Sequence, residues 1–227
     1  MKMIDHDDNS MYNLNFGNNV LEEKESVKFL GVTIDKHLKW NDHCKSLCSR
    51  LASSLYILRN VKHTLPTKIM KTLYYSFFYS HLQYGVLLWG SSASVENINR
   101  LRIMQKKAIR LVKNAKYNDH TSPLCKELKI LNIDDIIEIE HAKYMYKFNH
   151  NILPLELTKF LKRGNEIHGY ATRQENPISV KRNFAPLDHS FLTKAPAVWK
   201  KISKNVKDSK SLNNFIAKTK KEMFEKY

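Results

Sequence analysis

Within the first 35 residues, a short stretch alternates between apolar and polar side chains. The alternation is clear over residues 12–16, a turn is expected at Gly17, and the β-branched run 27–34 is typical of a further strand. We therefore predict a β-hairpin over residues 11–35, after a polar and disordered lead-in over residues 1–10. Because an isolated hairpin is only marginally stable in water, it should be covered by helices.

From residue 40 onward the period of the apolar positions changes from 2 to 3.6, which indicates helices. The first predicted helix follows Trp40 and carries one apolar stripe. Pro66 precedes the second, Ser94 with Glu96 opens the third, and Asn132 opens the fourth. Pro196 is expected to open a short helix. The predicted helices after the first span residues 67–83, about 95–115, 122–128, about 133–149, 154–162, a short stretch from 196, and 212 to about 225.

These elements define a mainly α fold. An N-terminal β-hairpin precedes a helical bundle over residues 36–162, and an irregular basic segment with a terminal helix follows over residues 163–227. The polar stretch 163–192, with its glycines and prolines, is expected to be an extended loop or irregular β-structure. The aromatic stretch 69–89 is long enough to cross a bilayer, but Lys71 and the polar residues around it favour a buried core helix. We expect no membrane contact.

Charge points to a polyanionic partner. The chain has 38 Lys and Arg against 22 Asp and Glu, a formal net charge of +16. Such an excess most often serves nucleic-acid binding, because neutralising phosphates drives that association. A genome rich in A and T, which favours Lys codons, is the alternative explanation.

The third predicted helix is the strongest candidate for such binding. Stepping 100° per residue places its apolar side chains on one arc, namely Leu101, Met104, Ala108, Leu111, Val112 and Ala115. The opposite side carries seven cations and no acid: Arg100, Arg102, Lys106, Lys107, Arg110, Lys113 and Lys116. Contact with a nucleic-acid backbone is the favoured interpretation, and a solvated or acid-paired face is the alternative.

The sequence offers little for catalysis or metal binding. Asp7–Asp8 lies in a polar stretch, and Asp134–Asp135 is better explained as the acidic first turn of a helix. Cys44 and Cys48 lie on the apolar stripe and are expected to be buried structural cysteines, since a zinc site needs about four ligands. We predict no catalytic and no metal-binding residues. The absence of a disulfide framework and of a signal peptide favours the cytoplasm or nucleus.

Several motifs occur in an order that resembles a known family. Ser26–Asp35 with Trp40 and His43 matches the pattern F-L-G-V-x-I-D…L-x-W-x-x-H. Further matches follow at Leu65-Pro66, Leu73-Tyr74, His81–Gly85, Leu88–Gly90, Gln105–Arg110, Tyr170 with Thr172-Arg173, Ala197–Trp199, and Ser211 with Phe215. This set resembles the C-terminal region of reverse transcriptases of non-LTR (LINE- or jockey-like) retrotransposons, from the end of the palm through the thumb.

The resemblance implies roles for individual segments. Phe29, Leu30 and Gly31 would form a primer grip that holds the primer end, and the helices after Trp40 would form the thumb. The catalytic carboxylates and their Mg²⁺ would lie upstream of this region, so the chain alone is expected to bear no cofactor and to be inactive.

The expected partners are an RNA/DNA duplex and the rest of the polymerase. A helical protein-interaction module, a part of a longer active polymerase, and a pseudogene product without a selected role are the alternatives.

Overall fold

A computed structural model describes residues 15–16, 19–20, 22–162, 179–180 and 190–227. Short antiparallel strand pairs are formed by β1 (Asn15–Phe16) with β2 (Asn19–Val20), β3 (Ser26–Phe29) with β4 (Val32–Asp35), and β5 (Leu161–Lys162) with β6 (Ser179–Val180). The helices are α1 (Asn41–Val61), α2 (Thr67–Leu73), η1 (Tyr74–Tyr79), α3 (Ser80–Gln83), α4 (Val86–Trp89), α5 (Val95–Lys113), α6 (Thr121–Leu128), α7 (Ile133–Asn149), α8 (Leu155–Thr158), α10 (Phe191–Lys201), α11 (Lys204–Lys207) and α12 (Leu212–Glu225). The predicted mainly α fold with an N-terminal hairpin is confirmed.

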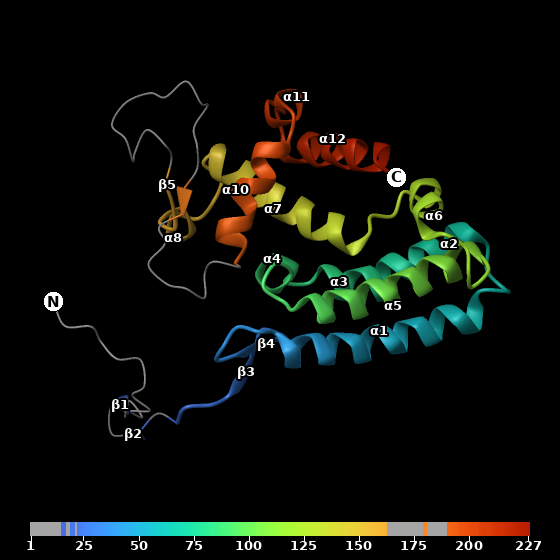
Figure 1. The fold of residues 1–227 in the computed structure, drawn as a ribbon, viewed down its shortest axis with the longest axis horizontal. Helices are drawn as coiled ribbons and strands as arrows, with labels where there is room; N and C mark the ends of the chain where they lie inside the picture. Colours follow the sequence, from blue (N-terminus) through green and yellow to red (C-terminus); the bar gives the residue numbers. More distant parts are fainter. Residues whose placement is uncertain (1–14, 17–18, 21, 163–178, 181–189) are drawn as a thin grey trace.

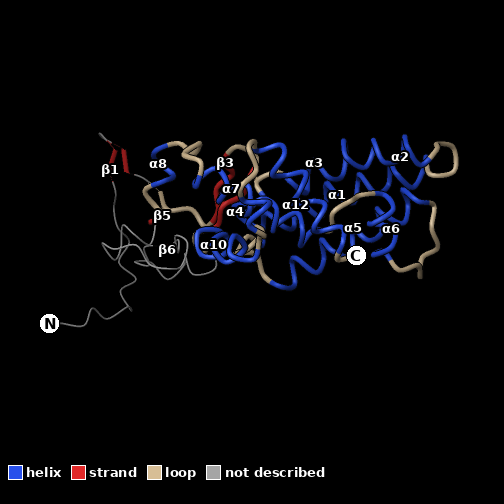
Figure 2. The backbone as a smooth tube through the Cα atoms, turned by 90° about the horizontal axis from the view of Figure 1, so that it is seen from above, coloured by secondary structure: helices blue, strands red, loops and turns tan. Residues whose placement is uncertain are grey.

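The helices form two packed groups that share α7 (Figure 1). In the first, α5 packs against α1, α2 and α6 and the hairpin strand β4 packs against α1; in the second, α7 packs against α10 and α12. Figure 2 shows α1, α2, α3, α5 and α6 of the first group gathered toward one end of the molecule, with α8 and α10 toward the other. Of the largest buried side chains, Trp89, Tyr74 and Phe78 lie in the first group, whereas Tyr146 and Phe215 lie in the second. Gly90 allows α4 to approach α7 closely, because a Cβ there would lie 2.8 Å from the Ile137 side chain.

The hairpin β3–β4 corrects the predicted single strand over residues 27–34. Phe29 pairs with Val32 across a two-residue turn, in which Leu30 has φ 46° and Gly31 has φ 82°. Such turns need positive φ at both central residues, which glycine adopts without strain and leucine does not. Gly31 therefore marks a turn, where alternation alone indicated a continuous strand.

Asp35 joins the hairpin to α1. Its Oδ1 accepts hydrogen bonds from the backbone N–H groups of His37 (3.1 Å) and Lys39 (3.0 Å), and its Oδ2 accepts one from Trp40 (2.7 Å). Burial by itself would raise the pKa of Asp35, but the hydrogen bonds from Lys39, Trp40 and His37 outweigh it and hold the pKa below its usual value. Trp40, with φ 62°, precedes α1 and supplies no side-chain cap. The Asp35 carboxylate thus fixes the chain reversal that starts the helix.

The predicted second helix is continuous from α2 through α3, but its middle turn is π-helical. The Ser80 N–H donates to the Tyr75 carbonyl five residues earlier, where an α-helix would bond four residues earlier. The Phe77 carbonyl in this turn accepts a hydrogen bond of 2.7 Å from the Ser54 hydroxyl of α1. A neighbouring helix therefore satisfies a backbone group within the irregular turn.

Other predicted boundaries shift. The helix expected over 154–162 ends at Thr158, and Leu161 lies in β5. The helix expected to open at Pro196 begins at Phe191 instead. Pro196 is buried inside α10, where its lack of an N–H interrupts the backbone hydrogen bonding. The lead-in 1–10 and most of the loop 163–192 lie outside the described residues. None of the described helices has the length and apolar character needed to cross a membrane.

Removing the Asp35 carboxylate should destabilise the protein. We expect Asp35→Ala to lower the free energy of unfolding by about 2–4 kcal/mol, because three backbone N–H groups lose a charged acceptor. Urea unfolding measures the change. Asp42→Ala is the matched control: Asp42 is exposed in the first turn of α1, and its loss should cost less than about 1 kcal/mol. Equal effects of the two substitutions would contradict the role given to Asp35.

Acid should destabilise the protein through His141. Burial lowers the pKa of this histidine to about 4, against an ordinary value of 6.5, although the nearby Glu140 carboxylate opposes the shift. The unfolded chain therefore binds a proton that the folded chain does not, and stability falls as the pH drops from 6.5 to 4, by on the order of 3 kcal/mol. Urea unfolding across this window measures the slope, and His141→Gln should flatten it.

The pH dependence of unfolding must be compared between the unmodified protein and His141→Gln, because other groups also change protonation in acid. Burial also lowers the pKa of His43, which adds to the loss of stability, whereas burial raises the pKa of Asp135, which opposes it. An unchanged slope in His141→Gln would contradict the assignment.

Candidate nucleic-acid interface

Helix α5 has one face in the core and one face in solvent. The buried side chains are Asn97, Ile98, Leu101, Gln105, Ala108, Ile109 and Val112. The predicted apolar arc was therefore correct in its centre, but Met104 and Leu111 lie at its edge and are half-buried, and Ala115 lies beyond the end of the helix. Gln105 was missed because a polar side chain breaks the apolar pattern. It donates hydrogen bonds to the Tyr74 hydroxyl (3.0 Å) and the Leu131 carbonyl (2.9 Å), which satisfies its amide in the core.

Three of the seven predicted cations have carboxylate partners. Arg100 pairs with Glu96 on the same helix at 2.6 Å. Lys113 pairs with Glu127 of α6. These cations therefore follow the alternative interpretation, a face paired with acids. The sequence showed no acid on this side of the helix, but carboxylates from its first turn and from neighbouring helices reach the cations.

Arg102 is the third cation of this group, and it forms the most specific pair. Its Nε and Nη2 donate to the two carboxylate oxygens of Asp134 in α7, at 3.0 and 2.8 Å. The hydrogen bond to Asp134 raises the pKa of this guanidinium, which is charged at neutral pH in any case. A two-pronged pair of this kind fixes the orientation of the arginine while leaving part of it exposed.

The remaining cations differ in their surroundings. Lys106 and Lys107 are exposed, and no ion pair involves them in the part of the chain that the structure describes. The Arg110 Nε donates to the Asp119 carbonyl at 2.9 Å, and its guanidinium lies over the Tyr117 ring. Lys116 does not lie on the helix as predicted, since α5 ends at Lys113 and Asn114 turns the chain with φ 53°.

The hairpin tip presents the three residues that the resemblance assigns to a primer grip. Phe29 and Leu30 are exposed, at 63% and 75%, and Gly31 lies against the Tyr84 ring. The Tyr84 hydroxyl donates a hydrogen bond to the Leu30 carbonyl. Tyr84 thus holds the backbone of the hairpin tip against the helices, while the Phe29 and Leu30 side chains are exposed to solvent.

Metal chemistry finds no support among the described residues. Within them, no group of three or more His, Cys, Asp or Glu side chains could hold a metal ion. Asp7 and Asp8 lie outside the described residues. Cys44 is buried, as predicted, whereas Cys48 is only half-buried; both are free thiols packed on the core.

A buried serine–histidine contact was not predicted. Ser91 Oγ lies 2.7 Å from Nε2 of His141, which is 2% exposed. The two residues are far apart in sequence, so no spacing signal could have indicated the contact. The hydrogen bond satisfies a buried imidazole whose low pKa keeps it neutral, which is a structural role.

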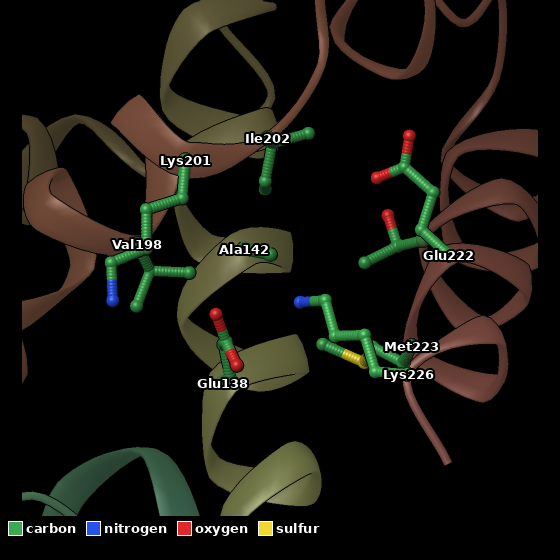
Figure 3. A pocket seen from close by; sticks show the side chains of 9 residues that line it. Glu138, Ala142, Val198, Lys201, Ile202, Glu222, Met223 and Lys226 are labelled. Atoms are coloured by element: carbon green, nitrogen blue, oxygen red, sulfur yellow. The ribbon is translucent and has the colours of Figure 1, made fainter.

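A small pocket lies between α7, α10 and α12 (Figure 3). Its volume is about 30 Å³, room for a water molecule at most. Its lining mixes both charges: Glu138 on α7 and Lys226, just after α12, face one another across it, with Lys201 and Glu222 at its edges. Mixed charge and small size make it unsuitable for a phosphate group.

The sequence of this chain is similar to that of known proteins, although its architecture has no match among solved structures. No protein-family model and no solved structure matches the chain. The chain is similar to three curated proteins of Drosophila melanogaster. It is 26% identical over 143 residues to the probable RNA-directed DNA polymerase from transposon BS, covering 61% of this chain and 16% of that protein.

The RNA-directed DNA polymerase from mobile element jockey is 25% identical over 135 residues, covering 57% of this chain and 14% of that protein. The probable RNA-directed DNA polymerase from transposon X-element is 24% identical over 125 residues, covering 54% and 14%. The matched region thus spans about a sixth or less of these relatives. The chain is a distant homologue of the RNA-directed DNA polymerases of non-LTR retrotransposons.

Proposed function

We propose that this protein binds a nucleic-acid duplex through the solvent face of α5, as the thumb-like part of an RNA-directed DNA polymerase. The observation that carries the proposal is the pair Lys106 and Lys107. Both are exposed, and neither forms an ion pair within the described residues, although the chain carries a net charge of +16. Adjacent uncompensated cations on a rigid helix attract phosphates and release the counterions that surround them.

The opposite face of α5 supports this role. Because that face is buried against α1, α2 and α6, the helix cannot rotate to hide its cations. Lysine and arginine contacts to phosphates position a duplex without reading its sequence. The proposed binding is therefore independent of base sequence and sensitive to salt, and it serves RNA/DNA hybrids such as a polymerase makes.

The hairpin tip is the second element of the proposal. Exposed Phe29 and Leu30 form an apolar tip that water does not favour, which is typical of a contact surface. We assign it to the end of the primer strand, with Gly31 forming the tight turn that presents these two side chains. The rest of the polymerase, with its Mg²⁺-binding carboxylates, is the proposed protein partner.

Reversing the charge of the central cations should abolish most of the binding. We expect the triple substitution Lys106→Glu, Lys107→Glu and Arg110→Glu to weaken duplex binding at least 100-fold at low salt. It should also reduce the slope of log Kd against log salt by roughly 2–3, because each lost phosphate contact removes about 0.9. Fluorescence anisotropy with a labelled RNA/DNA duplex across a salt series measures both quantities.

The matched control changes the same charge elsewhere. Lys45, Arg59 and Lys68 are exposed on α1 and α2, and their joint substitution by Glu should leave most of the salt slope intact. If the control weakens binding as much as the α5 variant, net charge and not this helix face determines the affinity.

Primer extension separates binding from catalysis. With a primed RNA template, Mg²⁺ and dNTPs, we expect no extension by this chain alone, because no described residues form a metal site. Extension above a protein-free control would show that the chain itself carries polymerase activity.

A further inference from the structure

A larger pocket opens beside the cations of α5. It lies between α5, the start of α6 and the start of α7, and its volume is about 270 Å³. That is just below the range of roughly 300–1,000 Å³ that is typical of pockets for small ligands. The pocket therefore has room for one small group and excludes a duplex.

The pocket combines two chemistries. Arg102 and Lys106 line it from α5, whereas Ile109 and the Cys125 thiol provide apolar lining. Burial raises the pKa of Cys125 to about 11, so its thiol stays neutral and does not repel an anion. Ser122 of α6 adds a hydroxyl. Cations together with apolar surface suit a phosphate joined to a heterocyclic base.

Asp134 and Tyr227 are two further residues in the lining of the pocket. Asp134 lines the pocket, but its charge is compensated by the two hydrogen bonds from Arg102. Tyr227 lines the pocket as well, and its hydroxyl accepts a 2.9 Å hydrogen bond from the Asn132 N–H and donates one to Asp135. A ring held in this way offers a fixed aromatic surface for stacking.

We propose that this pocket receives one unpaired nucleotide at the end of a duplex bound on α5, with its phosphate near Lys106 and its base near Tyr227. The inference rests on the proposed function and extends it from backbone contact to recognition of a strand end. A blunt duplex leaves the pocket empty, whereas a duplex with an unpaired terminal nucleotide fills it.

The test compares duplexes that differ by one nucleotide. Fluorescence anisotropy gives Kd for a blunt RNA/DNA duplex and for the same duplex with one unpaired nucleotide at the 3′ or the 5′ ends. We expect one of the two extended duplexes to bind about tenfold tighter, as stacking of a single base permits. Equal affinity of all three duplexes, with a steep salt dependence, would overturn this inference alone. No binding of any duplex would overturn the proposed function as well.

Adjacent lysines provide the matched control. Lys106 lines the pocket and Lys107 does not, although both are exposed on α5. Lys106→Ala should remove the preference for the extended duplex, whereas Lys107→Ala should weaken binding of blunt and extended duplexes by the same factor. Ser122→Phe fills the pocket without changing charge and should remove the preference while blunt binding persists. A preference that survives both Lys106→Ala and Ser122→Phe would place the nucleotide elsewhere.

Discussion

The burial of one face of α5 is the constraint on which the arrangement depends. Leu101, Ala108 and Val112 lie in the core among α1, α2 and α6, and this fixes which side chains of α5 meet solvent. Cations at the remaining positions of the helix cannot enter the core without losing their hydration, which is costly. The hydrophobic effect thus sets the position of the charges, and the packed helices keep them in a constant spatial pattern.

The helical part of the fold could be predicted largely from periodicity. Ser94 and Asn132 accept hydrogen bonds from Asn97 and Asp135 at the starts of α5 and α7, as capping chemistry indicates. The helix start at Pro196 was predicted wrongly because proline often opens a helix, whereas here it lies inside one. Gly31 was interpreted as part of a strand because alternation carries no information about φ. Local patterns indicate periodic elements well and indicate departures from them poorly.

The candidate interface could be predicted only in part. Sequence spacing placed Lys106 and Lys107 on the exposed side of α5, which the structure confirms. It could not indicate that Asp134 and Glu127 approach Arg102 and Lys113, because these contacts join different helices. It also gave no sign of the larger pocket, which exists only because α6 and α7 begin beside α5. Tertiary contacts between distant segments are the part that local sequence does not encode.

The π-helical turn between Tyr74 and Tyr79 has a consequence for how relatives are compared. Such a turn accommodates one additional residue in an otherwise regular helix, so the apolar pattern after it is shifted by one sequence position, roughly 100° of helical phase, relative to the pattern before it. A homologous chain that lacks this residue would keep the same apolar stripes on both sides and form an ordinary helix. Alignments across this stretch should therefore allow a gap of one position, even though a helix interior is where gaps are normally penalised most.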